Sequence, residues 1–291
     1  MAGLSAEEAR STEGDDEALP TPRTAEAAEV LRAAADAAAL GARSAMATVV
    51  ARRGSAPATP GQKLLLTESG LCVGTVGGGA VERSVLSALA ARLAPEASTG
   101  DALEDARVAT YKLGAELGMC CGGGVDVLLE TIAAATPTLL VGAGHIGSAA
   151  APLLASCGFA VTVVDEREEW AERDLHARET DARVRRVTGD FGFVGKSIPR
   201  RGIALTMTHD HQLDQRVVEW ALRERFAFVG GVGSRAKAAR TRARLEAKGF
   251  SEADVARVRM PIGLAIGART PQEIAVSIVA ELVAWKRGVA R

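Results

Sequence analysis

The stretch from Thr138 to Asp165, TLLVGAGHIGSAAAPLLASCGFAVTVVD, decides the fold of the second half of the chain. It begins with an apolar strand over 138–141, which runs into a Gly-rich turn over 142–147. A helix of small residues is expected over 148–157, and a second apolar strand over 160–164 ends at Asp165. This order and length predict a βαβ unit with two parallel strands.

The turn GAGHIG matches the G-x-G-x-x-G pattern of dinucleotide-binding folds, in the expected place between a strand and a helix. Gly142 permits the tight turn, Gly144 lets a phosphate approach the backbone, and Gly147 lets the helix pack close to the strand. The amides and the positive end of the helix favour an anion. Asp165 could accept a hydrogen bond from a ribose or a pterin-type donor.

The side chains within the turn leave two interpretations open. His145 either caps the start of the helix or faces a ligand. Ile146, between His145 and Gly147, is also a candidate contact to the cofactor. A Rossmann domain that keeps the turn without a ligand is the alternative to a binding site.

The same alternation of strands and helices continues to the end of the chain. The last helix begins at Thr270 and Pro271, where Glu273 completes a capping box. Further strands are expected over 183–187, 203–208 and 227–230, and further helices over 213–224 and 235–248. The sequence therefore predicts a Rossmann-like, doubly wound parallel sheet with helices on both faces.

The first half predicts a separate α/β domain. An Ala-rich helix is expected over 24–42, capped by Thr24, and a second helix over 80–93. Strands are expected over 45–52, 63–67, 71–76, 107–112 and 125–131. We divide the chain into a disordered, acidic tail over 1–23, an N-terminal domain over 24–135 and a C-terminal domain over 136–291.

Bulk properties narrow the class of protein. The 291 residues carry a net charge of -1, which lacks the broad positive field expected of a nucleic-acid-binding protein. The sequence shows neither an apolar run of membrane-spanning length nor a secretory signal, so we expect a cytoplasmic location and no membrane contact. The four cysteines do not have the spacing of a structural zinc site.

Several separate segments resemble the XdhC/CoxI family, the accessory proteins of molybdenum hydroxylases. The segments are RRGSAPATPGQKLLL, VGTVGGGAVE, LGMCCGGGVDVLLE, VGAGHIG, MTHDHQLD, GGVGSRAKAARTRARLEAKG and PIGLAIGARTPQEIAVSIVAEL. The resemblance covers nearly all of residues 24–288, and the first glycine-rich segments are closest to the XdhC branch. Ala80 stands where the carbon-monoxide-dehydrogenase-like branch more often has a cysteine, so a role of that cysteine does not carry over.

The resemblance implies a chaperone rather than a turnover enzyme, so no catalytic residue is assigned. Such a protein would bind the molybdenum cofactor, a molybdopterin with a terminal phosphate. It would hold the cofactor while a cysteine desulfurase replaces an oxo ligand by sulfido, and then insert it into apo xanthine dehydrogenase or a related molybdenum hydroxylase. A homodimer through the apolar C-terminal helix is compatible with the sequence.

Cys120, Cys121 and Gly122 begin a thiol-rich, glycine-rich segment that could approach the cofactor. Thiolates bind soft metal centres, so Cys121 or its neighbour is a candidate contact to molybdenum. Free cysteines are also commonly small buried hydrophobic residues, and this alternative carries equal weight.

Three further groups are candidate contacts to the cofactor. His209, Asp210 and His211 follow a predicted strand, where they could bind a pterin or, with Asp214, a metal; capping by Asp210 or polar ligand contacts are favoured over zinc. Ser234 and Arg235 open a basic helix after a glycine turn and resemble a second anion site. Gly78 and Gly79 form a strand–glycine–helix junction in the first domain, which packing alone could also require.

An NAD(P)-dependent oxidoreductase is the alternative function. The Gly-rich turn and the acidic residue that ends the next strand, Asp165, fit NAD(P) as the cofactor. Apart from His209, the sequence offers no proton donor in the usual arrangement.

Overall fold

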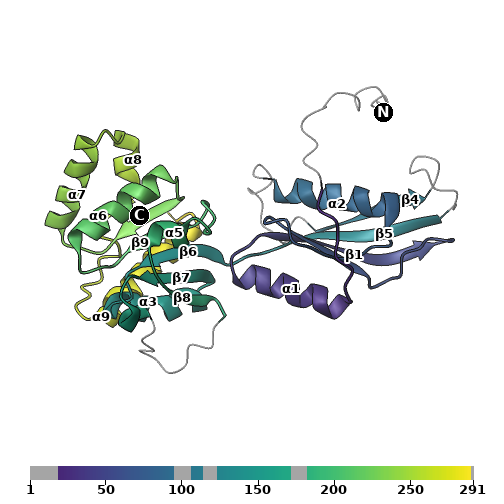
Figure 1. Ribbon diagram of the computed structural model, residues 1–291, viewed down its shortest axis with the longest axis horizontal. Coiled ribbons are helices and arrows are strands. Elements are labelled where there is room, and N and C mark those ends of the chain that lie inside the picture. Colours follow the sequence, from purple (N-terminus) through teal and green to yellow (C-terminus); the bar gives the residue numbers. More distant parts are fainter. Residues whose placement is uncertain (1–18, 95–105, 114–122, 172–181, 290–291) are drawn as a thin grey trace. The chain divides into compact units, whose positions relative to one another are not determined.

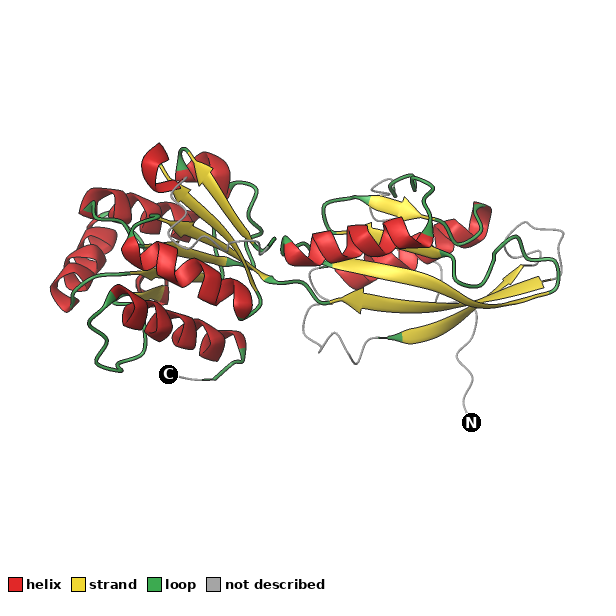
Figure 2. Ribbon diagram, turned by 90° about the horizontal axis from the view of Figure 1, so that it is seen from below, coloured by secondary structure: helices red, strands yellow, loops and turns green. Residues whose placement is uncertain are grey.

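The chain divides into two compact units. The computed structural model describes residues 19–94, 106–113, 123–171 and 182–289 (Figures 1 and 2). The first unit comprises residues 1–35 and 43–133, and the second comprises residues 36–42 and 134–291.

The first unit is an antiparallel sheet with a helix on each face (Figure 1). Its five strands have the order β3-β2-β1-β5-β4. The strands are β1 (Ser44–Arg53), β2 (Lys63–Thr67), β3 (Cys72–Gly74), β4 (Arg107–Leu113) and β5 (Gly123–Ile132). The helices are α2 (Gly79–Leu93) and α1 (Ala27–Ala39), whose residues 36–39 are counted with the second unit.

Alternation along β1 explains why both faces of this sheet are covered. Ala45 and Ala47 belong to the core beneath α2, whereas Met46 packs with Val30 and Ala34 of α1. Successive side chains of a strand point to opposite faces, so an uninterrupted apolar strand requires a cover on each side.

The second unit is a six-stranded parallel sheet with the order β11-β10-β9-β6-β7-β8. The strands are β6 (Thr136–Val141), β7 (Phe159–Asp165), β8 (Val184–Thr188), β9 (Ile203–Thr206), β10 (Phe228–Gly231) and β11 (Val258–Arg259). Parallel strands with crossover helices confirm the predicted doubly wound, Rossmann-like fold.

Helices cover both faces of this sheet (Figure 2). They are α3 (His145–Ser156), α4 (Glu168–Ala171), α5 (Phe191–Gly195), α6 (His211–Arg223), α7 (Arg235–Ala247), α8 (Glu252–Arg257) and α9 (Pro271–Lys286). α3 and α9 pack together on the side of Leu140 and Leu205, while α6 covers Val141 and Ala204 on the other side.

The strand order places a topological switch point at the centre of the sheet. From β6 the chain proceeds to β7 and β8 on one side, and then crosses to β9, β10 and β11 on the other. The loops after β6 and β9 therefore leave the sheet in opposite directions and open a crevice at the carboxyl ends of the strands, where ligands bind in such folds.

The expected elements recur with shifted ends. The predicted cap at Thr24 is wrong, because α1 begins at Ala27 and the Glu26 carbonyl accepts its first hydrogen bonds. β9 ends at Thr206, before the predicted end at residue 208. The capping box of Thr270 and Glu273 is confirmed. The sequence missed α4, α5, α8 and β11, which are too short to produce a periodic pattern.

The close approach of α3 to the turn that precedes it gives the first prediction. A Cβ at position 147 would lie 2.0 Å from the Gly142 carbonyl oxygen, whereas a Cβ at position 144 would meet no atom within 4 Å. Gly147→Ala should therefore destabilise the second unit by about 1–3 kcal/mol, because α3 must move away from the turn. Gly144→Ala should change its stability by less than about 1 kcal/mol.

Urea unfolding followed by tryptophan fluorescence measures this difference for the second unit alone. All three tryptophans, Trp170, Trp220 and Trp285, lie in its sequence. Equal midpoints for the two variants would contradict the packing role of Gly147.

Candidate functional site

The three glycines of the turn meet three different steric requirements. Gly142 has a φ of +108°, and a Cβ there would lie 2.7 Å from the Met207 carbonyl oxygen. Gly147 lies against the Gly142 carbonyl, as described above. Gly144 alone faces open space, so its missing side chain leaves room for a group from outside the protein.

The start of α3 presents unpaired backbone donors. Within the described residues, no hydrogen bond runs from the N–H groups of Gly144, Ile146 or Gly147 to another protein atom. Gly144 is the N-cap residue, and no side chain caps the helix there. Because these N–H groups lie at the positive end of the helix dipole, they favour a bound anion.

Asp165 ties this turn to the end of β7. Its carboxylate accepts hydrogen bonds from the Ala143 N–H (2.9 Å) and from the Arg167 N–H (3.1 Å). The Arg167 guanidinium donates two more, each of 2.9 Å. Burial alone would raise the pKa of the Asp165 carboxyl, but these hydrogen bonds outweigh burial and hold its pKa below the usual value.

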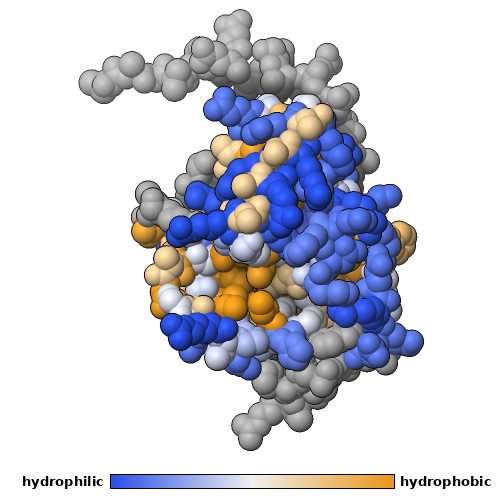
Figure 3. Space-filling view, turned by 90° about the vertical axis from the view of Figure 1, so that its left-hand side faces the viewer, coloured by the Kyte–Doolittle hydropathy of each residue, from blue (hydrophilic) through white to orange (hydrophobic). Residues whose placement is uncertain are grey.

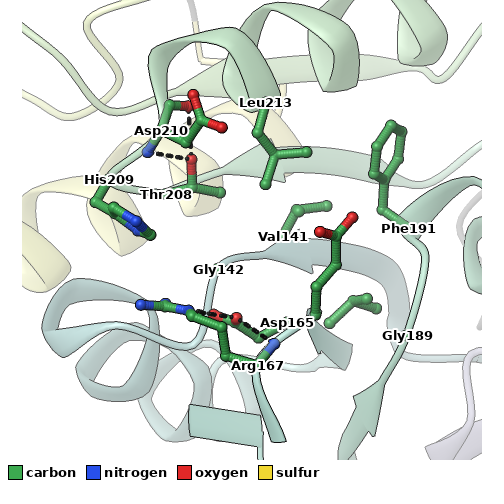
Figure 4. Close-up of a pocket in the computed structure, with 12 residues that line it drawn as sticks. Val141, Gly142, Asp165, Arg167, Gly189, Phe191, Thr208, His209, Asp210 and Leu213 are labelled. Atoms are coloured by element: carbon green, nitrogen blue, oxygen red, sulfur yellow. Dashed lines mark hydrogen bonds and ion pairs between the residues drawn. The ribbon is translucent and has the colours of Figure 1, made fainter.

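A pocket of about 120 Å³ opens beside the turn, at the carboxyl ends of β6, β7, β8 and β9 (Figure 4). Arg167 and His209 lie at one side of it and Phe191 at the other. The pocket is lined by Val141, Gly142, Val164, Asp165, Glu166, Arg167, Gly189, Phe191, Thr208, His209, Asp210 and Leu213. Apolar walls with a few polar groups are typical of ligand sites, and this volume suits one ring system rather than a whole dinucleotide.

A buried carboxylate holds the loop that forms the far wall of the pocket. Asp214 is 1% exposed and accepts hydrogen bonds from the hydroxyls of Thr206 and Thr208, from the Thr208 N–H (3.2 Å), and from the Lys237 ammonium. Lys237 also donates to the Val232 carbonyl (3.0 Å). This network connects the loops after β9 and β10, so the pocket wall is fixed by a fully partnered ion pair.

The structure brings part of the predicted site together. Gly142, Asp165, His209 and Asp210 line the pocket, whereas residues 144–147 continue the turn from Gly142 and do not line it. Asp210 also caps α6 by accepting a hydrogen bond from the Gln212 N–H (2.7 Å), which confirms the expected capping.

The other predicted residues do not line this pocket. His211 and Arg235 are exposed at the first positions of α6 and α7, and Ser234 caps α7 by accepting from the Lys237 N–H (3.1 Å). Gly78 and Gly79 belong to the first unit, where both have positive φ at the start of α2 and face open space. Cys120, Cys121 and Gly122 lie outside the described residues.

Sequence reasoning missed several residues that shape the site. Glu166 and Arg167 directly follow Asp165, and the strand-end position was the only available signal for them. Phe191 and Leu213 gave no signal, because apolar residues near helix starts are common. In the described parts of the chain, no group of three or more His, Cys, Asp or Glu side chains could hold a metal ion. None of the described helices has the length and apolar character needed to cross a membrane.

Two family models match the chain. Residues 138–282 match the XdhC Rossmann domain, and residues 37–105 match the XdhC and CoxI family. The protein YqeB of Escherichia coli, which is uncharacterised, is 32% identical over 248 residues, 83% of this chain and 43% of YqeB. A Bacillus subtilis protein named as a probable component of xanthine dehydrogenase is 29% identical over 168 residues, 57% of this chain and 47% of that protein.

The chain therefore spans less than half the length of these two curated relatives. A crystal structure of a xanthine dehydrogenase from Bacillus halodurans is 21% identical, with a TM-score of 0.47, and the match covers 92% of this chain and 97% of that one.

The lowered pKa of Asp165 gives the second prediction. A carboxyl whose pKa is lower in the folded state stabilises that state at neutral pH, and this contribution is lost as the pH falls through the folded-state value. Asp165→Asn should cost the second unit about 2 kcal/mol near pH 7. The difference from the unmodified protein should shrink below about pH 4.

Urea midpoints measured between pH 3 and pH 7 test this, with Glu168→Gln as a control that removes a nearby exposed carboxylate. A difference that stays constant down to pH 3 would show that Asp165 does not contribute through its charge.

Proposed function

Because this chain belongs to the XdhC and CoxI family, we propose that it binds the molybdenum cofactor and holds it during the maturation of a xanthine dehydrogenase or a related molybdenum hydroxylase. The cofactor is cargo in this proposal, and the chain needs no catalytic residue of its own. The observation that carries the proposal is the open backbone at Gly144, beside N–H groups that lack a partner within the described residues.

The residues present fit a phosphate-bearing pterin. The N–H groups of Gly144, Ile146 and Gly147 would hold the terminal phosphate, because they lie at the positive end of α3 and no side chain competes for them. The adjoining pocket offers apolar walls from Phe191 and Leu213, which suit a flat ring. Asp165 would position the turn through Ala143, and a direct contact of Asp165 with the cofactor remains a prediction.

The proposed partners follow from the family and from the curated relatives. One relative is named as a probable component of xanthine dehydrogenase, which supports an apo xanthine dehydrogenase as the acceptor of the cofactor. We also propose a cysteine desulfurase as the sulfur donor, and a homodimer as the assembly state. Figure 3 shows one face where hydrophilic side chains surround an apolar hollow, the kind of surface that protein partners contact.

The alternative function, an NAD(P)-dependent oxidoreductase, would use the same Gly-rich turn and the same crevice at the switch point as the proposed chaperone. NAD needs an acceptor for its ribose hydroxyls at the end of β7. The Asp165 carboxylate already accepts four hydrogen bonds from the protein, so a ribose would need another acceptor there. The preference for the cofactor chaperone therefore rests on the family and not on this residue.

The phosphate contact gives the third prediction. Gly144→Asp places a preferred N-cap residue at the start of α3, so the variant should be at least as stable as the unmodified protein. The new carboxylate would accept hydrogen bonds from the N–H groups that we propose bind the phosphate, and its charge would repel that anion. We expect the molybdenum and pterin that copurify after co-expression with the cofactor pathway to fall at least tenfold, with a matching loss of co-expressed xanthine dehydrogenase activity.

Ser251→Asp is the matched control, because it adds the same charge at the N-cap of α8, outside the pocket. Its molybdenum and pterin content should equal that of the unmodified protein. Full occupancy of Gly144→Asp would refute the proposed phosphate site. Titration with NADH tests the alternative, since tight NADH binding without any pterin binding would favour the oxidoreductase.

The thiol contact gives the fourth prediction. If Cys121 contacts molybdenum, Cys121→Ala should lower the molybdenum content per bound pterin, while Cys72→Ala should not. Cys72 is a buried residue of the first unit, and burial, followed by the nearby Glu82, raises the pKa of its thiol to about 11, so it is a poor metal ligand. Unchanged molybdenum in Cys120→Ala and in Cys121→Ala would remove the ligand role.

A further inference from the structure

We infer that Glu166 recognises the ring end of the bound ligand, by accepting hydrogen bonds from N–H or O–H groups of an uncharged ring. The inference extends the proposed function, because it assigns the pocket beside the phosphate site to a defined chemistry. It also separates the roles of two adjacent carboxylates at the end of β7.

The neighbouring carboxylate is not available for this task. Asp165 is 7% exposed, and each of its oxygens accepts two hydrogen bonds. Oδ2 accepts from the Ala143 N–H and from Arg167 Nη2, and Oδ1 accepts from the Arg167 N–H and from Arg167 Nε. A carboxylate has about four lone-pair sites, so these four bonds use its capacity. A ligand that bonded to Asp165 would first have to displace Arg167 or the N–H group of the turn.

Glu166 differs from Asp165 in each of these respects. It lines the same pocket, its side chain is exposed, and within the described part of the chain it has neither a hydrogen-bond partner nor an ion-pair partner. An ionised carboxylate accepts hydrogen bonds only, so its ligand must present donors. Such bonds are stronger than those between neutral groups.

The charge of the pocket determines which ligands it admits. Its lining contains the carboxylates of Asp165, Glu166 and Asp210 and the single guanidinium of Arg167, which gives a net formal charge of -2 with His209 neutral. A phosphate is therefore disfavoured inside the pocket, although it is favoured at the N–H groups of the turn next to it. The two subsites thus select opposite ends of one ligand.

The apolar walls complete this selection. Val141, Val164, Phe191 and Leu213 offer contacts to the faces of a ring, while Glu166 offers an acceptor to its edge. The amino-bearing edge of a pterin and the hydroxyl pair of a ribose both supply such donors. The shared requirement is a neutral, donor-bearing ring within reach of the phosphate site, and a ribose with a 2′-phosphate does not meet it.

Probes that carry no phosphate test the pocket independently of the turn. We would titrate the full-length protein with pterin and, separately, with adenosine, and compare it with Glu166→Gln and with the control Glu168→Gln. Glu168 is exposed and acidic but does not line the pocket. Glu166→Gln should raise the Kd of whichever probe binds by about tenfold, because a charged acceptor becomes neutral. Glu168→Gln should leave that Kd unchanged.

A negatively charged probe adds a second measurement, which a purely structural role of Glu166 would not affect. Adenosine 2′-monophosphate should bind Glu166→Gln more tightly than it binds the unmodified protein, because a repelling charge has been removed. A pterin response identifies the pterin as the ring, and an adenosine response identifies a nucleoside. If neither probe binds, or if both glutamine variants behave alike, the inference is wrong.

The two proposals can fail separately. Gly144→Asp should lose phosphate-bearing ligands but keep pterin or adenosine, because the ring probes do not use the turn. Ring binding that depends on Glu166, without any phosphate binding at the turn, would refute the phosphate site on which the proposed function rests and leave this inference standing. Phosphate binding at the turn, with no effect of Glu166→Gln on ring binding, would refute this inference and leave the phosphate site standing.

Discussion

The hydrogen bond from the Ala143 N–H to the Asp165 carboxylate connects the two parts from which the site is built. It joins the turn after β6 to the end of β7, and the bidentate Arg167 holds the same carboxylate from the pocket side. A buried charge needs such partners, because burial without them would favour its neutral form. The geometry of the proposed phosphate site therefore depends on a carboxylate that does not itself have to touch the ligand.

A second buried carboxylate repeats this design on the other side of the switch point. Asp214 binds the hydroxyls of Thr206 and Thr208 and the ammonium of Lys237, so the loops after β9 and β10 are held together as β6 and β7 are by Asp165. The Asp214–Lys237 pair lies behind the pocket lining, whereas the Asp165–Arg167 pair is part of that lining. The exposed groups that remain, Glu166 and His209 among them, can then interact with a ligand without also having to hold the loops.

The sequence predicts those features whose cause is local. The spacing of Gly142, Gly144 and Gly147 reflects steric contacts within one turn, and the capping box of Thr270 and Glu273 spans a single helical turn, so both were readable. Apolar strands and amphipathic helices gave the parallel sheet for the same reason. The pairing of Asp214 with Lys237, across 23 residues, left no such trace, because a residue type does not reveal its partner. The sequence alone likewise could not distinguish the roles of Asp165 and Glu166, because it does not show which of the two carboxylates has hydrogen-bond partners.

The different partners of Asp165 and Glu166 affect how an acidic residue at a strand end is interpreted in a fold of this type. The expected arrangement has the acidic residue at the end of the second strand accept the ribose hydroxyls. Here that position has its acceptors occupied by the turn and by Arg167, and the next residue carries the free carboxylate. A pattern of glycines followed by an acidic residue therefore indicates the proposed phosphate subsite more directly than the proposed ring subsite. The proposed phosphate subsite uses backbone N–H groups that the glycine spacing indicates, whereas the proposed ring subsite depends on which side chain has no partner within the protein.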